Sequence, residues 1–321
     1  SAFGYKTEEK DFSVTDASDP GTIKVVLTET QRQTVTFSGL PQGAVLTVSH
    51  ATAGQIKPES GDSYRLPPGE YSYTVVVKGY EPLVNQTLTV AAEPVNKTVV
   101  MTPLSAAQPW DGTARTAVTP IGGTYYIKSG AELAWFADQI NAKNLLDAQA
   151  ILLADINLGS KNWTSIGSYD RIFNGSFDGN GCTVSGLAGT CFGLFYGTGT
   201  SGIIENLTVS GSITGSSNTG GIVGVNYGTV KSCAANVVIT ANGQRVGGVA
   251  GNNSGGSISG CVALAPVSSS YTSGGSGSSS YLAALGGIAG QNSGTIEFSY
   301  SMAKVTATGQ NPDGGDRKSV V

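Results

Sequence analysis

The sequence GGIVGVNYGTVKSC, which begins at Gly220, recurs as GGVAGNNSGGSISGC from Gly247 and as GGIAGQNSGTIEFS from Gly286. Aligned on its second glycine, each copy reads Gly-apolar-small-Gly, carries an asparagine five residues later and returns a glycine two residues after that. A weaker copy, GLFYGTGTSGIIENL, precedes them and begins at Gly193. The anchor glycines are spaced by 28, 27 and 39 residues, and the last interval contains a Ser/Gly-rich insert that begins at Ser268. A period of this length predicts a solenoid.

The residue types decide which kind of solenoid forms. Each copy consists mainly of Gly, Val, Ile, Ser, Thr and Asn, and its short β-branched segments are bounded by glycine or asparagine, as is typical of strands joined by tight turns. About 27 residues accommodate roughly three strands of about five residues with their turns. Stacked coils would pair these strands in parallel and in register. The repeats therefore predict a parallel β-helix, which we expect to be right-handed like other parallel crossover connections.

Three kinds of position in the repeat should have structural roles. Glycines are expected at corners where φ is positive and a Cβ would clash. Asn226, Asn253 and Asn292 are expected to form a stacked amide ladder at a corner rather than a ligand site. The β-branched column and a second column should point into a narrow core, and this second column holds Leu207, Cys233, Cys261 and Ser299.

Composition excludes several classes of function. Charged residues make up 12% of the 321 residues, the net charge is −4, and no apolar run is long enough to span a membrane. We therefore expect neither nucleic acid as a partner nor membrane insertion. The four cysteines lack metal-ligand spacing and the chain has one histidine, so no metal and no cofactor is expected. Cys233 and Cys261 should be buried thiols one rung apart, whereas pairing of Cys182 with Cys191 stays open.

The N-terminal third has a different pattern. Residues 1–21 are polar and aperiodic and are expected to form an arm or linker, whereas residues 22–103 contain short alternating strands separated by turns at LPQG, LPPGE and GYEP, which predicts an antiparallel β-sandwich. The segments GAVLTVSH, LPPGEYSYTVVVKGYEP and TVVMTP resemble PEGA-type and carboxypeptidase-regulatory-like modules of bacterial surface proteins. This resemblance implies a spacer or docking module rather than an enzyme.

A second module should begin after a linker. Residues 104–120 are rich in Pro, Ala and Thr and are expected to connect two domains, the second of which would cover residues 121–321. Within it, residues 130–143 should form an amphipathic helix, because Ser129 and Glu132 make a capping box and apolar residues follow with helical spacing. An open β-helix end exposes an unpaired sheet edge. We therefore place this helix as a cap on the first coil.

The order of motifs in this module resembles a known family. The segments ELAWFA, ADINL, NWTSIG and FNGSFDGNG, followed by GLFYG, GIVG, GVAG and GIAG, resemble the GLUG-motif proteins, a family of bacterial surface β-helices, over residues 110–307. The resemblance implies a secreted or wall-associated protein of adhesin type. It implies no set of catalytic residues.

Many parallel β-helices act on polysaccharides, so an enzyme is the main alternative. A polysaccharide lyase or glycosidase needs closely placed carboxylates, and the candidates are Asp155, Asp170 and Asp178. Asp178 lies in the sequence FDGNG, where its carboxylate is expected to bond its own main chain in a turn. This structural role is favoured over catalysis, and we expect no enzymatic activity.

Exposed aromatic side chains can stack on sugar rings, and they provide the candidate binding residues. Tyr271 and Tyr281 bracket the Ser/Gly insert, which should protrude from the solenoid as loops on rigid scaffolds often do, and Tyr227 lies in a repeat. Tyr169, Tyr196 and Trp163 are further possibilities, although Trp163 fits a core position. The sequence thus predicts a non-catalytic, monomeric, secreted or cell-surface protein that binds or displays a glycan or protein. A spacer without a ligand remains a second alternative.

Overall fold

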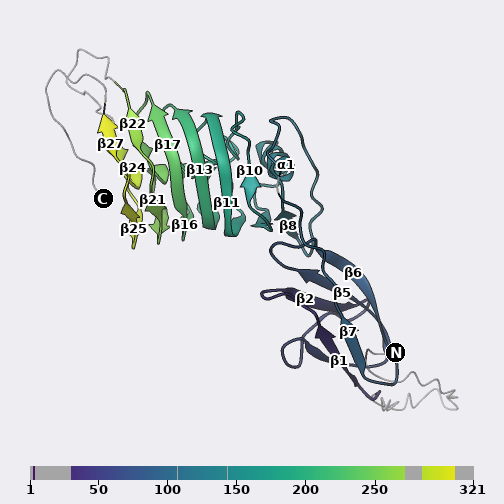
Figure 1. The fold of residues 1–321 in the computed structure, drawn as a ribbon. Helices are drawn as coiled ribbons and strands as arrows, with labels where there is room; N and C mark the ends of the chain where they lie inside the picture. The colour runs from purple at the N-terminus through teal and green to yellow at the C-terminus, as the bar shows by residue number, and fades with distance from the viewer. Residues whose placement is uncertain (1–2, 4–29, 107, 143, 272–283, 308–321) are drawn as a thin grey trace, which may run out of the picture. The chain divides into compact units, whose positions relative to one another are not determined.

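The computed structural model describes Phe3 and residues 30–106, 108–142, 144–271 and 284–307 (Figure 1). The chain divides into two compact units, Ser1–Leu104 and Ser105–Val321. Most of the arm expected over residues 1–21, and the strand expected over residues 22–29, lie outside the described residues. Strands are the main secondary structure of both units, and α1 (Gly130–Asn141) covers most of the helix expected at residues 130–143.

The first unit packs two small sheets around one apolar core. One sheet has the order β4-β1-β7 and the other β3-β2-β5-β6. Side chains alternate along β5, where Tyr71, Tyr73 and Val75 are buried, and Phe37 of β1 packs edge-on against Tyr73. The pairs are antiparallel except that β7 joins β1 in parallel. The strands are β1 (Gln33–Ser38), β2 (Val45–His50), β3 (Gly54–Ile56), β4 (Ser63–Leu66), β5 (Gly69–Val76), β6 (Leu83–Val90) and β7 (Val95–Thr98).

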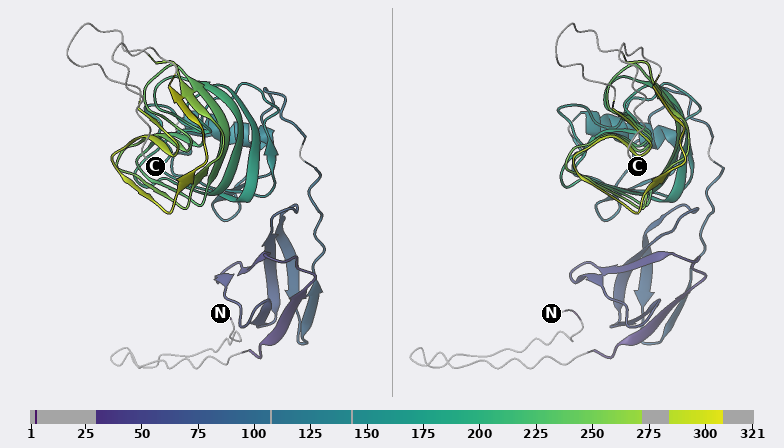
Figure 2. Two further views of the ribbon diagram at one scale, coloured as in Figure 1. Left: turned by 60° about the vertical axis from the view of Figure 1, so that its left-hand side comes forward. Right: turned by 90° about the vertical axis from the view of Figure 1, so that its left-hand side faces the viewer.

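The second unit is a parallel β-helix of about five turns. Its strands form three parallel ladders, and the coils superimpose when viewed along the solenoid axis (Figure 2, right). The largest ladder contains β8 (Thr124–Ile127), β9 (Gln149–Leu152), β10 (Ile156–Asn157), β11 (Ser176–Thr190), β13 (Ile203–Gly215), β16 (Thr229–Lys231), β17 (Ala234–Ala241), β20 (Ser257–Ser259), β21 (Val262–Ala263), β22 (Val267–Ser269), β25 (Thr295–Glu297), β26 (Tyr300–Ser301) and β27 (Val305–Ala307). The other two contain β12 (Phe195–Thr198), β15 (Val223–Asn226), β19 (Ala250–Asn253) and β24 (Ala289–Asn292), and β14 (Thr219–Gly220), β18 (Val246–Gly247) and β23 (Leu285–Gly286).

The register confirms that one sequence repeat makes one coil. The β-branched column forms a ladder in which Ile204 pairs with Val230, Val230 with Ile258 and Ile258 with Ile296. The first three of these side chains are fully buried. The thiols of the neighbouring column are buried as expected, and all four cysteines are free, including Cys182 and Cys191. The apolar columns therefore hold successive coils in one register, since a one-residue slip would turn them outward.

The asparagine column forms the predicted amide ladder, but it does so inside the solenoid. Asn226 Nδ2 donates to Asn253 Oδ1 over 2.8 Å, and Asn253 Nδ2 donates to Asn292 Oδ1 over 2.7 Å. Asn226 and Asn253 are fully buried and have no positive φ. The left-handed corner lies at another column of the repeat, which contains Asn206, Ser232, Gly260 and Phe298.

The glycine expectation was wrong for most of the repeat glycines. Gly247 and Gly248 are not left-handed, and their role is instead to permit close approach between coils. A Cβ at Gly248 would lie 2.3 Å from Gly287 O and 2.5 Å from Ala263 Cβ. Contacts this short do not occur in folded proteins, so the steric crowding of stacked main chains requires glycine at this position.

The helix α1 packs on the first coil, as the capping prediction required. Ser129 accepts a hydrogen bond from the Glu132 main chain at the N-cap, and the buried ring of Phe136 lies 6.3 Å from the rings of Phe173 and Phe177. Trp110, which belongs to the segment 104–120 that was expected to connect the domains, also contacts this end. The Trp110 side chain is buried there and packs edge-on against Trp163 at 5.7 Å.

Candidate functional site

Three tyrosines from separate turns of the β-helix gather on its surface, and we call this set the tyrosine patch: Tyr169, Tyr196 and Tyr227. Tyr169 is 85% exposed and Tyr227 is 41% exposed, whereas Tyr196 is half-buried. The hydroxyl group of Tyr196 lies close enough to those of Tyr169 and Tyr227 for each of them to affect its pKa. The patch therefore offers aromatic faces and hydroxyl groups together, which is a suitable surface for carbohydrate.

Main-chain pairing fixes the position of each member. Tyr196 lies on β12, where its neighbour Phe195 points into the core and its own N–H donates to Ile166 O over 2.8 Å. Tyr227 follows β15, and its N–H donates to Thr198 O over 3.0 Å. Tyr169 lies in a tight turn closed by two hydrogen bonds between Ser168 and Arg171. Two members thus sit on ladder-bonded main chain, which holds their Cα atoms in place.

Phe192 supports the patch from beneath. Its ring packs edge-on against Tyr196 with centroids 4.8 Å apart. Phe192 and Tyr196 occupy positions at which the three later copies of the repeat have glycine. Phe192 was missed as a site residue in the sequence, although this departure from the repeat is a signal that could have revealed it.

The environment raises the pKa of the Tyr196 hydroxyl. Burial is the main cause, and the neighbouring hydroxyls of Tyr169 and Tyr227 raise the pKa further because their phenolate forms would repel that of Tyr196. The Tyr196 hydroxyl therefore keeps its proton and can act as both hydrogen-bond donor and acceptor.

The candidate aromatic residues do not all join this patch. Tyr271 Oη accepts a hydrogen bond over 2.8 Å from Nε2 of Gln244, which lies in the preceding coil. Tyr281 lies outside the described residues. Trp163 is buried, and its Nε1 donates to Leu194 O over 3.1 Å. Of the binding residues expected from the sequence, Tyr227 is thus joined by Tyr169 and Tyr196.

The candidate carboxylates have structural partners. Asp178 Oδ1 accepts from Asn180 N over 2.7 Å, which is the turn expected from FDGNG. Asp155 Oδ1 accepts from Thr183 N over 2.8 Å on the adjacent coil, and Asp170 Oδ1 accepts from Ser168 Oγ over 3.1 Å. Each oxygen that bonds a main-chain N–H stabilises a turn or a coil-to-coil contact.

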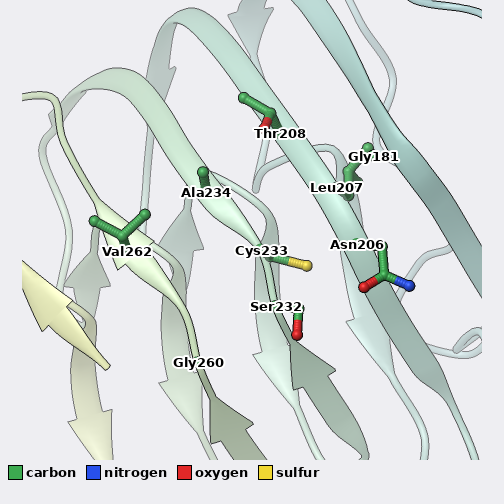
Figure 3. A pocket seen from close by; sticks show the side chains of 9 residues that line it. All are labelled: Gly181, Asn206, Leu207, Thr208, Ser232, Cys233, Ala234, Gly260 and Val262. Atoms are coloured by element: carbon green, nitrogen blue, oxygen red, sulfur yellow. The ribbon is translucent and has the colours of Figure 1, made fainter. Parts of the chain in front are cut away.

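A shallow groove crosses another corner of the β-helix (Figure 3). It has a volume of about 390 Å³ and follows the left-handed column past Asn206, Ser232 and Gly260, and Cys233 also lines it. Within the described ranges, no three His, Cys, Asp or Glu side chains cluster closely enough to hold a metal ion. No membrane-spanning helix is found in the part of the chain that the structure covers.

The fold and the patch define a class, the parallel β-helix proteins with a separate small β-sheet module. No family model matches the chain, and no solved structure matches it. The chain is similar to halomucin of Haloquadratum walsbyi, with 34% identity over 158 residues. The match covers 44% of this chain and 2% of halomucin, so the chain spans a small fraction of the length of that curated relative.

Proposed function

We propose that this chain is a non-catalytic, secreted or cell-surface protein of adhesin type whose β-helix binds carbohydrate at the tyrosine patch. The gathering of Tyr169, Tyr196 and Tyr227 from three separate turns carries this proposal. Sugar rings present C–H groups that pack on aromatic faces, and their hydroxyls can form hydrogen bonds with the tyrosine hydroxyls. The similarity to halomucin supports a surface location, because its name describes a mucin. The resemblance to GLUG-motif and PEGA-type modules, drawn from the sequence, agrees with this location.

The alternative of a polysaccharide lyase or glycosidase is less well supported. Asp155 and Asp178 each accept a main-chain hydrogen bond, and this structural role explains both carboxylates without a catalytic one. Such an enzyme would also need its carboxylates within a substrate cleft. A spacer without a ligand would explain the ladders but would leave the exposed tyrosines without a role.

The test is binding of the purified full chain to a glycan and mucin array. We expect retention on specific glycans and a loss of at least about tenfold in affinity when Tyr169 and Tyr227 are both replaced by alanine, since tenfold corresponds to about 1.4 kcal/mol. Tyr300→Ala is the matched control, because Tyr300 is 58% exposed and lies on β26 rather than in the patch. Its affinity should equal that of the unmodified chain.

Three results would contradict the proposal. No retention on any glycan would leave a spacer or a protein-binding adhesin, and equal retention of the double variant would place the site elsewhere. Release of shortened glycans that depends on Asp155 or Asp178 would favour the enzyme. Melting temperatures of the variants should match that of the unmodified chain, because the altered side chains are exposed.

A further inference from the structure

Cys233 and Cys261 occupy the same position on adjacent coils. Ala234 pairs with Val262, and Val262 N donates to Cys233 O over 2.9 Å, so the two cysteines are neighbours in register. Adjacent parallel strands lie ~4.8 Å apart, and this spacing falls within the Cα separation of disulfides. The cysteines therefore satisfy the first geometric requirement for a covalent bond between coils.

Both cysteine side chains are almost completely buried, and their thiols approach main-chain oxygens. Cys233 Sγ lies 3.1 Å from Lys231 O, and Cys261 Sγ lies 3.5 Å from Val230 O on the coil that carries Cys233. The Cys261 sulfur therefore lies toward the neighbouring coil. The interaction between the two thiols lowers the pKa of Cys261 and raises that of Cys233, because the Cys233 proton stabilises the Cys261 thiolate. The thiolate is the reactive form of cysteine, so Cys261 is the nucleophile that can attack an oxidised Cys233 sulfur.

Local main-chain structure allows the adjustment that a disulfide dihedral needs. Cys233 lies at a corner between β16 and β17, and Cys261 lies at the equivalent corner between β20 and β21. Each follows a left-handed residue, Ser232 or Gly260. The two cysteines therefore lie between the flanking strands rather than within them.

The groove shown in Figure 3 gives small molecules a route to Cys233. Cys233 lines it directly, and so do Gly260 and Val262, the residues on either side of Cys261. A volume of about 390 Å³ is ample for a molecule the size of a peroxide. Cys182 does not share this arrangement, because its neighbour in register is Leu207.

We propose that Cys233 and Cys261 form a peroxide-oxidised disulfide that links two neighbouring coils. The Cys233 thiolate, which lines the groove, attacks hydrogen peroxide, keeps one oxygen as a sulfenic acid and releases hydroxide, which takes the proton of Cys261. The Cys261 thiolate then attacks the Cys233 sulfur, forms the S–S bond and expels the second oxygen as hydroxide, which is protonated to water. Two thiols and one peroxide thus give one disulfide and two waters.

The test uses the reduced full chain treated with hydrogen peroxide. The intact mass should fall by about 2 Da, since disulfide formation removes two hydrogens. The number of titratable thiols should fall from four to two, and peptide mapping should recover a cross-linked peptide containing Cys233 and Cys261. The melting temperature should rise on oxidation and return to its starting value with a reductant.

Two variants provide the controls. Cys261→Ser should abolish the mass decrease, whereas a variant with Cys182→Ser and Cys191→Ser should retain it. The second variant keeps the test decisive if Cys261→Ser fails to fold, a point that far-UV circular dichroism would settle. Four titratable thiols in the treated chain, or a cross-linked peptide containing Cys182 or Cys191, would overturn the proposal.

Discussion

Replacing Asn253 by alanine should destabilise the β-helix far more than the same change one coil further on. Asn253 is fully buried and makes three side-chain hydrogen bonds: it accepts from Asn226 Nδ2 over 2.8 Å and donates to Asn292 Oδ1 over 2.7 Å and to Thr295 O over 3.2 Å. Each such bond contributes about 1 kcal/mol, so the loss should be about 3 kcal/mol. Asn292→Ala removes the two bonds accepted from Asn253 Nδ2 and Gly294 N, but it does so at an exposed position where water can replace them, so it should cost about 1 kcal/mol.

Urea unfolding followed by far-UV circular dichroism would measure these differences, and hydrogen exchange of residues 247–263 would locate them. The ladder also predicts that the effects of replacing Asn226 and Asn253 on the free energy of unfolding are not additive, because the two side chains share one hydrogen bond. The double alanine variant should therefore be less destabilised than the sum of the single variants, by about 1 kcal/mol. A cost of less than about 1 kcal/mol for Asn253→Ala would refute the view that the buried amide ladder stabilises the coil stack.

Two further predictions concern a glycine and an acid. Gly248→Ala should cost about 3 kcal/mol in the same urea experiment, because its Cβ would overlap Gly287 O. Gly255→Ala should cost about 1 kcal/mol, because φ is +82° there but no atom lies within 4 Å of the new Cβ. A larger cost for Gly255→Ala than for Gly248→Ala would contradict the steric argument. The N–H groups of Ala114 and Thr113 lower the pKa of Asp111 below 3.8. The resulting stabilisation is present above the unfolded-state pKa and is lost as the pH falls through the folded-state pKa. Acid should therefore change the fluorescence emission of Trp110, whose Nε1 donates a hydrogen bond to Ala114 O. Asp111→Asn should remove this pH-dependent change.

The interior of the β-helix could be predicted because it is periodic. Each inward column repeats once per coil, so the sequence spacing alone predicts that Val230 pairs with Ile258 and Asn226 with Asn253. The capping helix was predictable for a related reason, since its apolar face has a regular spacing and needs a partner. Periodicity and burial constrain the same residues.

Other structural features could not be predicted from the sequence, because they depend on contacts between residues that are far apart in the chain. The reason for Gly248 is the closeness of Gly287, which lies on the next coil, and of Ala263, which lies opposite it in the same coil. Trp110 lies in a segment whose composition is that of a linker, yet it is buried against Trp163, more than fifty residues further along the chain. Composition predicts the local conformation of a segment, whereas the roles of these residues depend on packing against residues distant in the sequence.

Under the proposed function, the tyrosine patch separates ligand binding from the stability of the solenoid. Phe192 and Tyr196 can replace glycine in their coil because the next coil keeps Gly224, where a Cβ would lie 3.0 Å from Phe192 Cβ and 2.6 Å from Tyr196 O. The substitution therefore leaves the inward columns unchanged and alters the outer surface. Exposed residues such as Tyr169 and Tyr227 have no ladder to maintain, so ligand specificity can change at these positions while the coil stack keeps its register.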